Sequence, residues 1–283
     1  MSLSAANIQS LAEQPPAAAM QRARGRGRIA VKTLHDRTKL DTLFQEGCAK
    51  IRLPRTHGKA IEAVLINTAG GLTGGDDLRW EANAEAGSRL VLTTQACERV
   101  YKSMGDVAHI ECRLSAGAGA HLDWLPQETI LFEDSRLDRT LEVDLDEGAT
   151  FTAVEAVLLG RAAMGEAARS ARMSDRWRIR RNGRLVHAEA LRLTGSDDER
   201  DGIGLLAGNH AFATVLAITP DADRRLHHVR EILAGTRFAA ASAIGERLVV
   251  RIAAPSGMAL RKSLAPVLAL LSGTGALPRL WTI

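Results

Sequence analysis

Three stretches of this chain share one pattern, and that pattern limits the fold more than any other feature. In each stretch, a run that alternates apolar and polar residues reaches a glycine, and a second apolar run follows; the glycines are Gly87, Gly119 and Gly148. Alternation is typical of half-buried strands, and glycine permits the backbone of a tight turn. The glycines lie 32 and 29 residues apart. This spacing predicts a mainly β fold of stacked layers, as in a β-solenoid or sandwich, rather than a parallel sheet with crossover helices.

The pattern changes after the polar segment GSDDERDGIG at 195–204, which predicts an exposed loop. Beyond it, apolar residues recur at helical spacing over 221–233 and 256–271, with a strand between them at 246–253. Pro266 is expected to bend the second helix or delay its start. We therefore expect a β-rich region over 28–194 and a smaller α+β region over 205–283 with two helices, packed together as one structural unit.

The N-terminal segment is rich in arginine and glycine. Arg22, Arg24, Arg26 and Arg28 account for most of the formal net charge of +4, so we expect a flexible arm over 1–27. Such an arm can bind polyanions. Aromatic residues make up only 4% of the chain, which leaves few platforms for stacked bases and argues against a nucleic-acid partner.

A glycine-rich turn follows an apolar run that predicts a buried strand. Gly70, Gly71, Gly74 and Gly75 precede two adjacent carboxylates, Asp76 and Asp77. A phosphate-binding P-loop would need a Lys and a Ser or Thr where these acids stand, so nucleotide binding is disfavoured. The two acids are either solvated turn residues or hard oxygen ligands for a cation.

Catalytic motifs are weak throughout the chain. There is no G-x-S-x-G or H-E-x-x-H pattern, and the three cysteines form neither a C-x-x-C pair nor a disulfide framework. No run of about eighteen apolar residues predicts a membrane span, and we expect a reducing, cytoplasmic setting. Several carboxylates stand in or beside apolar runs, where a charged group must find a partner or shift its pKa.

Taken together, several ordered patches resemble the urease accessory proteins of the D/H type. The patches are GGLTGGDDL at 70–78, LTTQACERVYKS at 92–103, LPQETILFEDSRL at 125–137, LLGRAAMGE at 158–166, DRWRIRRNGRLVHAEALRL at 175–193 and LPRLWTI at 277–283. The resemblance covers nearly the whole chain after about residue 28. The chain departs from the family at 67–69, where Asn-Thr-Ala replaces a common proline.

The resemblance implies a non-enzymatic scaffold for urease maturation. It implies that the chain binds apo-urease together with the family's F and G proteins, of which the G protein hydrolyses GTP, and assists nickel insertion. It implies no tightly bound cofactor, a transient Ni²⁺ at most, and a homodimer within the accessory complex. It also implies a mostly β fold, in agreement with the repeats.

The same resemblance singles out particular residues. The carboxylates that match a proposed internal metal route are Asp76, Asp77, Glu155 and Glu189, and further motif residues are the four glycines of the turn, Tyr101 and Glu128. Carboxylate oxygens suit a route that must release the ion again. The alternative is an anion- or ligand-binding protein, or an enzyme, that uses the loop at 70–77.

Overall fold

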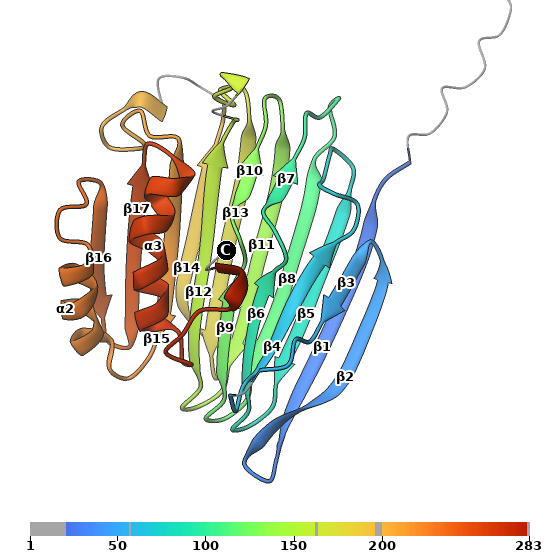
Figure 1. Ribbon diagram of the computed structural model, residues 1–283, viewed down its shortest axis with the longest axis vertical. Helices are drawn as coiled ribbons and strands as arrows, with labels where there is room; N and C mark the ends of the chain where they lie inside the picture. Colours follow the sequence, from blue (N-terminus) through green and yellow to red (C-terminus); the bar gives the residue numbers. More distant parts are fainter. Residues whose placement is uncertain (1–20, 57, 162–163, 196–199, 282–283) are drawn as a thin grey trace, which may run out of the picture.

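Two β-sheets stacked face to face form the body of the molecule (Figure 1). The computed structural model describes residues 21–56, 58–161, 164–195 and 200–281. In spatial order, sheet A contains β14 (Arg184–Leu193), β13 (Arg172–Arg181), β11 (Arg136–Leu145), β8 (Ala108–Ala116), β5 (Asp77–Ala84), β1 (Arg24–Leu34) and β2 (Arg37–Gly47). Sheet B contains β16 (Ala239–Ile244), β17 (Arg247–Ala254), β15 (Ala211–Ile218), β12 (Thr150–Leu159), β9 (His121–Leu125), β6 (Arg89–Thr94), β4 (Ile61–Asn67) and β3 (Ala49–Arg52), with β10 (Thr129–Leu131) and β7 (Glu98–Val100) at its side.

The three repeats build the centre of both sheets. In each repeat the first strand (β5, β8 or β11) lies in sheet A and the second (β6, β9 or β12) in sheet B, and successive repeats pair in parallel. The turn glycines all have positive φ, and the turns stack: the amide of Gly87 donates to the carbonyl of Ala118 and that of Gly119 to Glu147. The predicted mainly β, stacked, solenoid-like architecture is confirmed.

The hydrophobic core has two layers. The larger lies between the sheets and includes Trp80, Leu122 and Trp177. The smaller lies between the outer face of sheet B and two helices, α2 (Ala222–Ile232) and α3 (Gly257–Leu271). Figure 1 shows α3 lying across β15 and β17, with α2 beside β16.

The two helices confirm the predicted helical segments. Ser256 caps α3, since its hydroxyl accepts from the amide of Ala259. Pro266 lies inside α3 and does not delay its start. A 3-10 turn, η2 (Arg279–Trp281), ends the described chain. Among the described residues, no helix is both long and apolar enough to cross a membrane.

The expected arm over 1–27 is wrong in its last four residues. Residues 1–20 lie outside the described residues, but β1 begins at Arg24 and alternates exposed arginines with buried glycines. A Cβ at Gly27 would overlap the ring of Trp80, and one at Gly25 would press on Ala49. The Arg-Gly alternation is therefore a strand whose inner face has no room for side chains.

The expected exposed loop over 195–204 is also wrong in part. Residues 196–199 lie outside the described residues. Arg200, however, is buried, and its guanidinium donates to the backbone carbonyls of Ala168 and Ala171. Arg200 therefore has a structural role: its long side chain holds the turn at 168–171 by hydrogen bonds to backbone carbonyls, which the sequence pattern does not reveal.

Candidate functional site

The glycine turn at 70–75 packs tightly against the residues after β7. A Cβ at Gly71 would overlap the ring of Tyr101, and one at Gly74 would overlap the hydroxyl of Ser103. The Tyr101 hydroxyl donates to the carbonyl of Gly70 at 3.2 Å. Gly71 and Gly74 are needed for this close approach, and Gly70 and Gly75 have positive φ, which glycine adopts without strain.

Several amides of the turn are already engaged. Leu72 donates its N–H to the carbonyl of Arg99 at 2.7 Å, and Gly75 donates to Val107 at 2.9 Å. Thr73 donates to the carboxylate of Asp76 at 2.7 Å. An anion would have to compete with these bonds, so the turn is not a ready phosphate cradle.

The two adjacent carboxylates of the turn separate into different environments. Asp76 is buried, and its second oxygen accepts from the amide of Ala23 at 2.8 Å. Asp77 begins β5, is half-buried and pairs with Arg79 at 2.8 Å on the outer face of sheet A. The two carboxylates therefore have different partners, in the glycine turn and on the outer face of sheet A, and do not form one cation site.

An interior triad of charged residues joins the two sheets. Arg139 on β11 forms a two-pronged ion pair with Asp175 on β13, with distances of 3.1 and 2.8 Å. Its third nitrogen lies 2.5 Å from Glu155 on β12 of sheet B. Trp124 donates its indole N–H to Glu155 at 2.9 Å. All three charged side chains are at most 7% exposed.

The interior triad carries two carboxylates for one guanidinium. Burial raises the pKa of Glu155 above its ordinary value, and the positive charge of Arg139 opposes that shift. Burial also raises the pKa of the nearby Cys112 thiol, which keeps it protonated and a poor metal ligand. The triad can therefore accept a further positive charge, either a proton or a cation, at Glu155.

Glu128 fastens the C-terminal helix to sheet B. Its carboxylate accepts from Arg261 of α3 at 3.0 and 2.6 Å, and the Cys97 thiol donates to it at 3.4 Å. Burial, with the adjacent Glu128 carboxylate adding to the effect, raises the pKa of Cys97 to about 11. The geometry gives Glu128 an anchoring role, since it is 3% exposed and fully partnered.

Glu189 lies at the far end of the sandwich, on the inner side of β14. It accepts from Arg251 of β17 at 2.6 Å and so links the last strand of sheet A to the second strand of sheet B. The four carboxylates of the expected metal route thus lie in separate places, each with its own partner. Within the described parts of the chain, no three His, Cys, Asp or Glu side chains converge as a metal cluster, and the route stays a prediction.

Two members of the interior triad were missed by the sequence analysis, although the sequence carries a signal for them. Arg139 falls on the same strand phase as Leu137 and Leu141, and Asp175 on the same phase as Trp177; all are buried. A charged residue on the apolar phase of an alternating strand indicates a buried ion pair.

A second missed cluster lies on the outer face of sheet B. Asp123 is fully buried; it accepts from the hydroxyl of Ser272 at 2.7 Å, and its other oxygen lies 2.8 Å from His121. His121 in turn contacts Thr150 at 2.7 Å and the amide of Gly273 at 3.0 Å. This cluster pins the segment after α3 to the sheet.

Comparisons with known proteins give a consistent result. A family model described as UreD urease accessory protein matches residues 23–282. A protein named urease accessory protein UreD from Chelativorans sp. (strain BNC1) is 64% identical over 275 residues, covering 97% of this chain and 99% of that protein. Proteins of the same name from Agrobacterium fabrum and Rhizobium etli are 54% and 53% identical, and the alignments cover 96% and 93% of this chain and 95% and 96% of theirs.

Proposed function

Since this chain belongs to the UreD urease accessory protein family, which acts in urease maturation, we propose that it is a non-enzymatic scaffold that binds apo-urease together with the F and G accessory proteins. The observation that carries the proposal is the family match, which spans nearly all of the described residues. The fold is compatible with it, because interior ion pairs join the two sheets and the Glu128–Arg261 pair holds the C-terminal helix to the segment after β9. A cytoplasmic location follows from the proposal, since the scaffold must meet newly made apo-urease and a GTP-hydrolysing partner.

We propose further that the chain assists nickel insertion, with Ni²⁺ as transient cargo. Carboxylates that already have protein partners hold a divalent ion weakly and can release it, as a transfer route requires. Glu155 is the strongest member of the expected route, because it lies between the sheets in a triad with an excess carboxylate. Asp76 is the weakest, because both of its oxygens hold the glycine turn together.

Urease activation in cells tests the scaffold proposal. Cells carry the urease subunits and the other accessory proteins, with or without this chain, and both urease activity and the nickel content of purified urease are measured. Activity and nickel should be lost together without the chain and return with it. Full activity in its absence would overturn the proposal.

A Glu155→Gln variant tests the nickel route separately from the scaffold. Glutamine can still accept from Trp124 but removes the carboxylate. The variant should co-purify with its partners and support less nickel loading, while the surface variant Glu142→Gln should load normally. Normal loading by Glu155→Gln would exclude that residue from the route. The homodimer is tested on the same complexes by measuring their mass.

The alternative, an anion-binding protein or enzyme that uses the loop at 70–77, has less support. Amides of the turn are engaged within the protein, and the space beside Gly71 and Gly74 is filled. We therefore put forward no second function.

A further inference from the structure

An apolar cleft of about 840 Å³ opens where the two sheets end. β14, the last strand of sheet A, is joined to β17 by the Glu189–Arg251 pair and by Arg247, which donates to the carbonyl of Val186. β16 continues sheet B as its last strand, and residues of β14, β15, β16 and β17 line the cleft. Its volume falls in the range of about 300–1,000 Å³ that ligand sites occupy.

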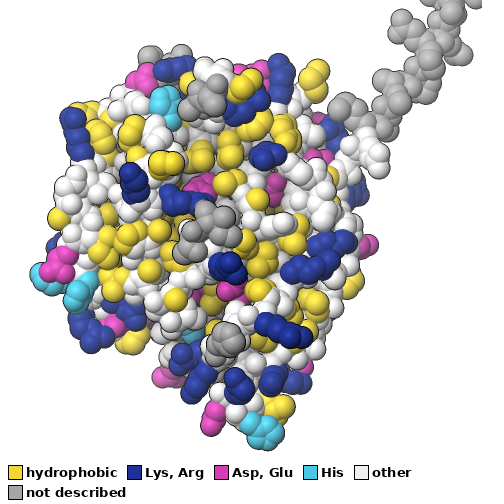
Figure 2. Space-filling view, viewed as in Figure 1, with side chains coloured by type: hydrophobic (Ala, Val, Ile, Leu, Met, Phe, Trp, Pro, Cys, Tyr) yellow, Lys and Arg dark blue, Asp and Glu magenta, His cyan; other side chains and the backbone are white. Residues whose placement is uncertain are grey.

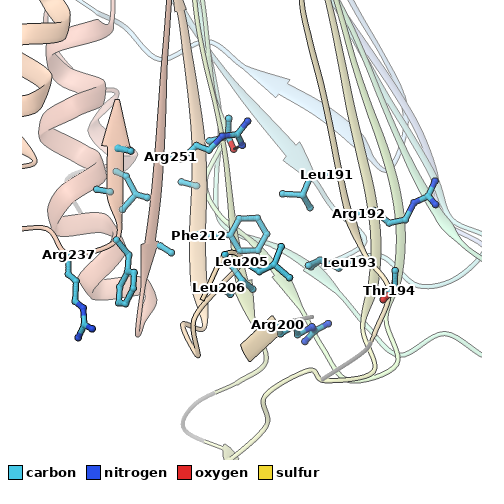
Figure 3. A pocket seen from close by; sticks show the side chains of 18 residues that line it. Leu191, Arg192, Leu193, Thr194, Arg200, Leu205, Leu206, Phe212, Arg237 and Arg251 are labelled. Carbon is cyan, nitrogen blue, oxygen red and sulfur yellow. Dashed lines mark hydrogen bonds between the residues drawn. The ribbon is translucent and has the colours of Figure 1, made fainter. Parts of the chain in front are cut away.

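The centre of the cleft is apolar. Leu191 and Leu193 line it from β14, and Phe212, Leu205 and Leu206 face them (Figure 3). Leu205 is 62% exposed and the neighbouring Ile203 is 89% exposed. Large apolar side chains exposed together beside a cleft are typical of a surface that a partner covers.

The described part of the rim of the cleft is basic. Four of the described lining residues are arginines and none is acidic. Arg251 forms an ion pair with Glu189, and Arg200 donates hydrogen bonds to backbone carbonyls. Arg192 and Arg237 lie on opposite rims, with their guanidinium groups directed away from the apolar centre (Figure 3). Arg237 packs over Phe238, and neither Arg192 nor Arg237 forms an ion pair with another described residue.

This arrangement distinguishes between two kinds of occupant. A small anionic ligand would need cationic groups that point into the cavity, whereas Arg192 and Arg237 point outward from its two rims. A longer occupant can place apolar side chains in the centre and carboxylates over both rims. The exposed Ile203, which adjoins the lining residue Gly204, extends the apolar surface past the cleft, as a longer occupant requires.

We propose that this cleft binds an apolar segment of another protein of the urease maturation complex, with acidic residues on either side of the apolar side chains. The inference rests on the proposed scaffold function and assigns one docking site to it. On Figure 2, Lys and Arg side chains are spread over the face that carries α2 and α3, so basic charge alone does not mark the site. The site is marked by the combination of an apolar centre with arginines that point outward from the two rims.

Photo-cross-linking in the assembled system tests the inference. A photoreactive phenylalanine analogue replaces Leu205 in the full chain, which is co-expressed with urease and the other accessory proteins. We expect a cross-link to one segment of one of these proteins, with Asp or Glu close to apolar residues. In an Arg192→Glu/Arg237→Glu background the cross-link should fall at least about tenfold, because like charges then face each other.

The matched control has the same change in charge. Arg184 lies on the same strand as Arg192 but outside the cleft, and Lys262 is exposed on α3. The Arg184→Glu/Lys262→Glu variant should keep the cross-link, and both double variants should unfold at the wild-type temperature. No cross-link, a cross-link to a second copy of this chain, a target segment without acidic residues, or equal loss in both double variants would overturn the inference.

The same cells separate this inference from the proposed function. If urease is activated without the chain, the scaffold proposal fails. If the chain is required but the cross-link from position 205 is unaffected by the rim variant, only the docking site fails.

Discussion

The outer faces of the two sheets differ sharply although their strands come from the same repeats. On sheet A the outer phase is charged: one register row across β1, β5, β8, β11 and β13 reads Arg28, Glu81, Arg113, Glu142, Arg178. On sheet B the outer phase is apolar, and residues such as Val154, Val215 and Val250 pack under α2 and α3. β8 therefore alternates buried residues with exposed or half-buried ones, whereas β9, the second strand of the same repeat, is buried along its whole length.

The comparison shows that one repeat unit can supply two kinds of strand. The first strand of a repeat has polar residues at alternate positions, so one of its faces can be exposed to solvent. The second strand lacks them, so its outer face must be buried under other elements. The two helices of the C-terminal region, α2 and α3, bury this outer face of sheet B. Strand alternation in a repeat thus reports which sheet meets solvent.

The largest effect is expected for an arginine on the inner face of sheet A. This sheet carries arginines on both faces: Arg139 is buried between the sheets, and Arg113 is exposed to solvent. Replacing Arg139 with Met leaves Glu155 and Asp175 without their shared partner between the sheets. We expect the free energy of unfolding to fall by about 3–5 kcal/mol, as when one member of a buried ion pair is removed. Urea denaturation measures it, and a loss below about 1 kcal/mol would mean that water reaches the triad.

The covered face of sheet B is tested at Gly273, where the chain passes over His121. A Cβ there would overlap the imidazole ring, so Gly273→Ala must displace the segment after α3. The expected loss is about 1–3 kcal/mol, as for overpacking elsewhere. Gly204→Ala, at an open position, is the control and should change stability by less than about 0.5 kcal/mol. Equal effects would show that the cover is loose.

Glu98, the first residue of β7, is a half-buried carboxyl, intermediate between the buried interior triad and the exposed charges of sheet A. Burial raises the pKa of Glu98 to about 7. A raised pKa means that the folded protein binds the proton more tightly, so this group's contribution to stability is present below about pH 4.5 and is lost as the pH rises through 7. Glu98→Gln should therefore stabilise the protein by about 1–2 kcal/mol at pH 8 and be neutral near pH 4. Thermal unfolding at both pH values measures it, and a pH-independent difference would rule out titration of Glu98 as the cause.

The smallest effect is expected on the exposed face of sheet A. Arg113 lies near Glu111 and Glu142 with 62% of its side chain exposed. Arg113→Met should cost less than about 1 kcal/mol, because exposed ion pairs contribute little. The same urea titration serves as the matched control for Arg139→Met. A loss as large as that of Arg139→Met would remove the distinction between the two phases.

The sequence by itself determined the repeats, the mainly β stacked fold and both helices, because period-2 and period-3.6 patterns and turn glycines are local properties. It also carried enough ordered motifs to indicate the family. It did not separate Asp76 from Asp77, because adjacent acids look alike until the fold buries the one in the glycine turn and leaves the other on the outer face of β5. The Arg-Gly run is a strand because it pairs with β2 and β5, and its glycines leave room for Trp80 and Ala49, which are distant in the chain.

Only the tertiary structure decided which charges share a partner. Arg139, Asp175 and Glu155 come from three strands in two sheets, and their meeting depends on register and on the stacking of the sheets. The cleft beyond β14 likewise exists because sheet A ends one strand before sheet B, a difference in extent that local patterns do not encode. Side-chain type and period are written along the chain, whereas the distance between strands that are far apart in sequence is set by packing alone.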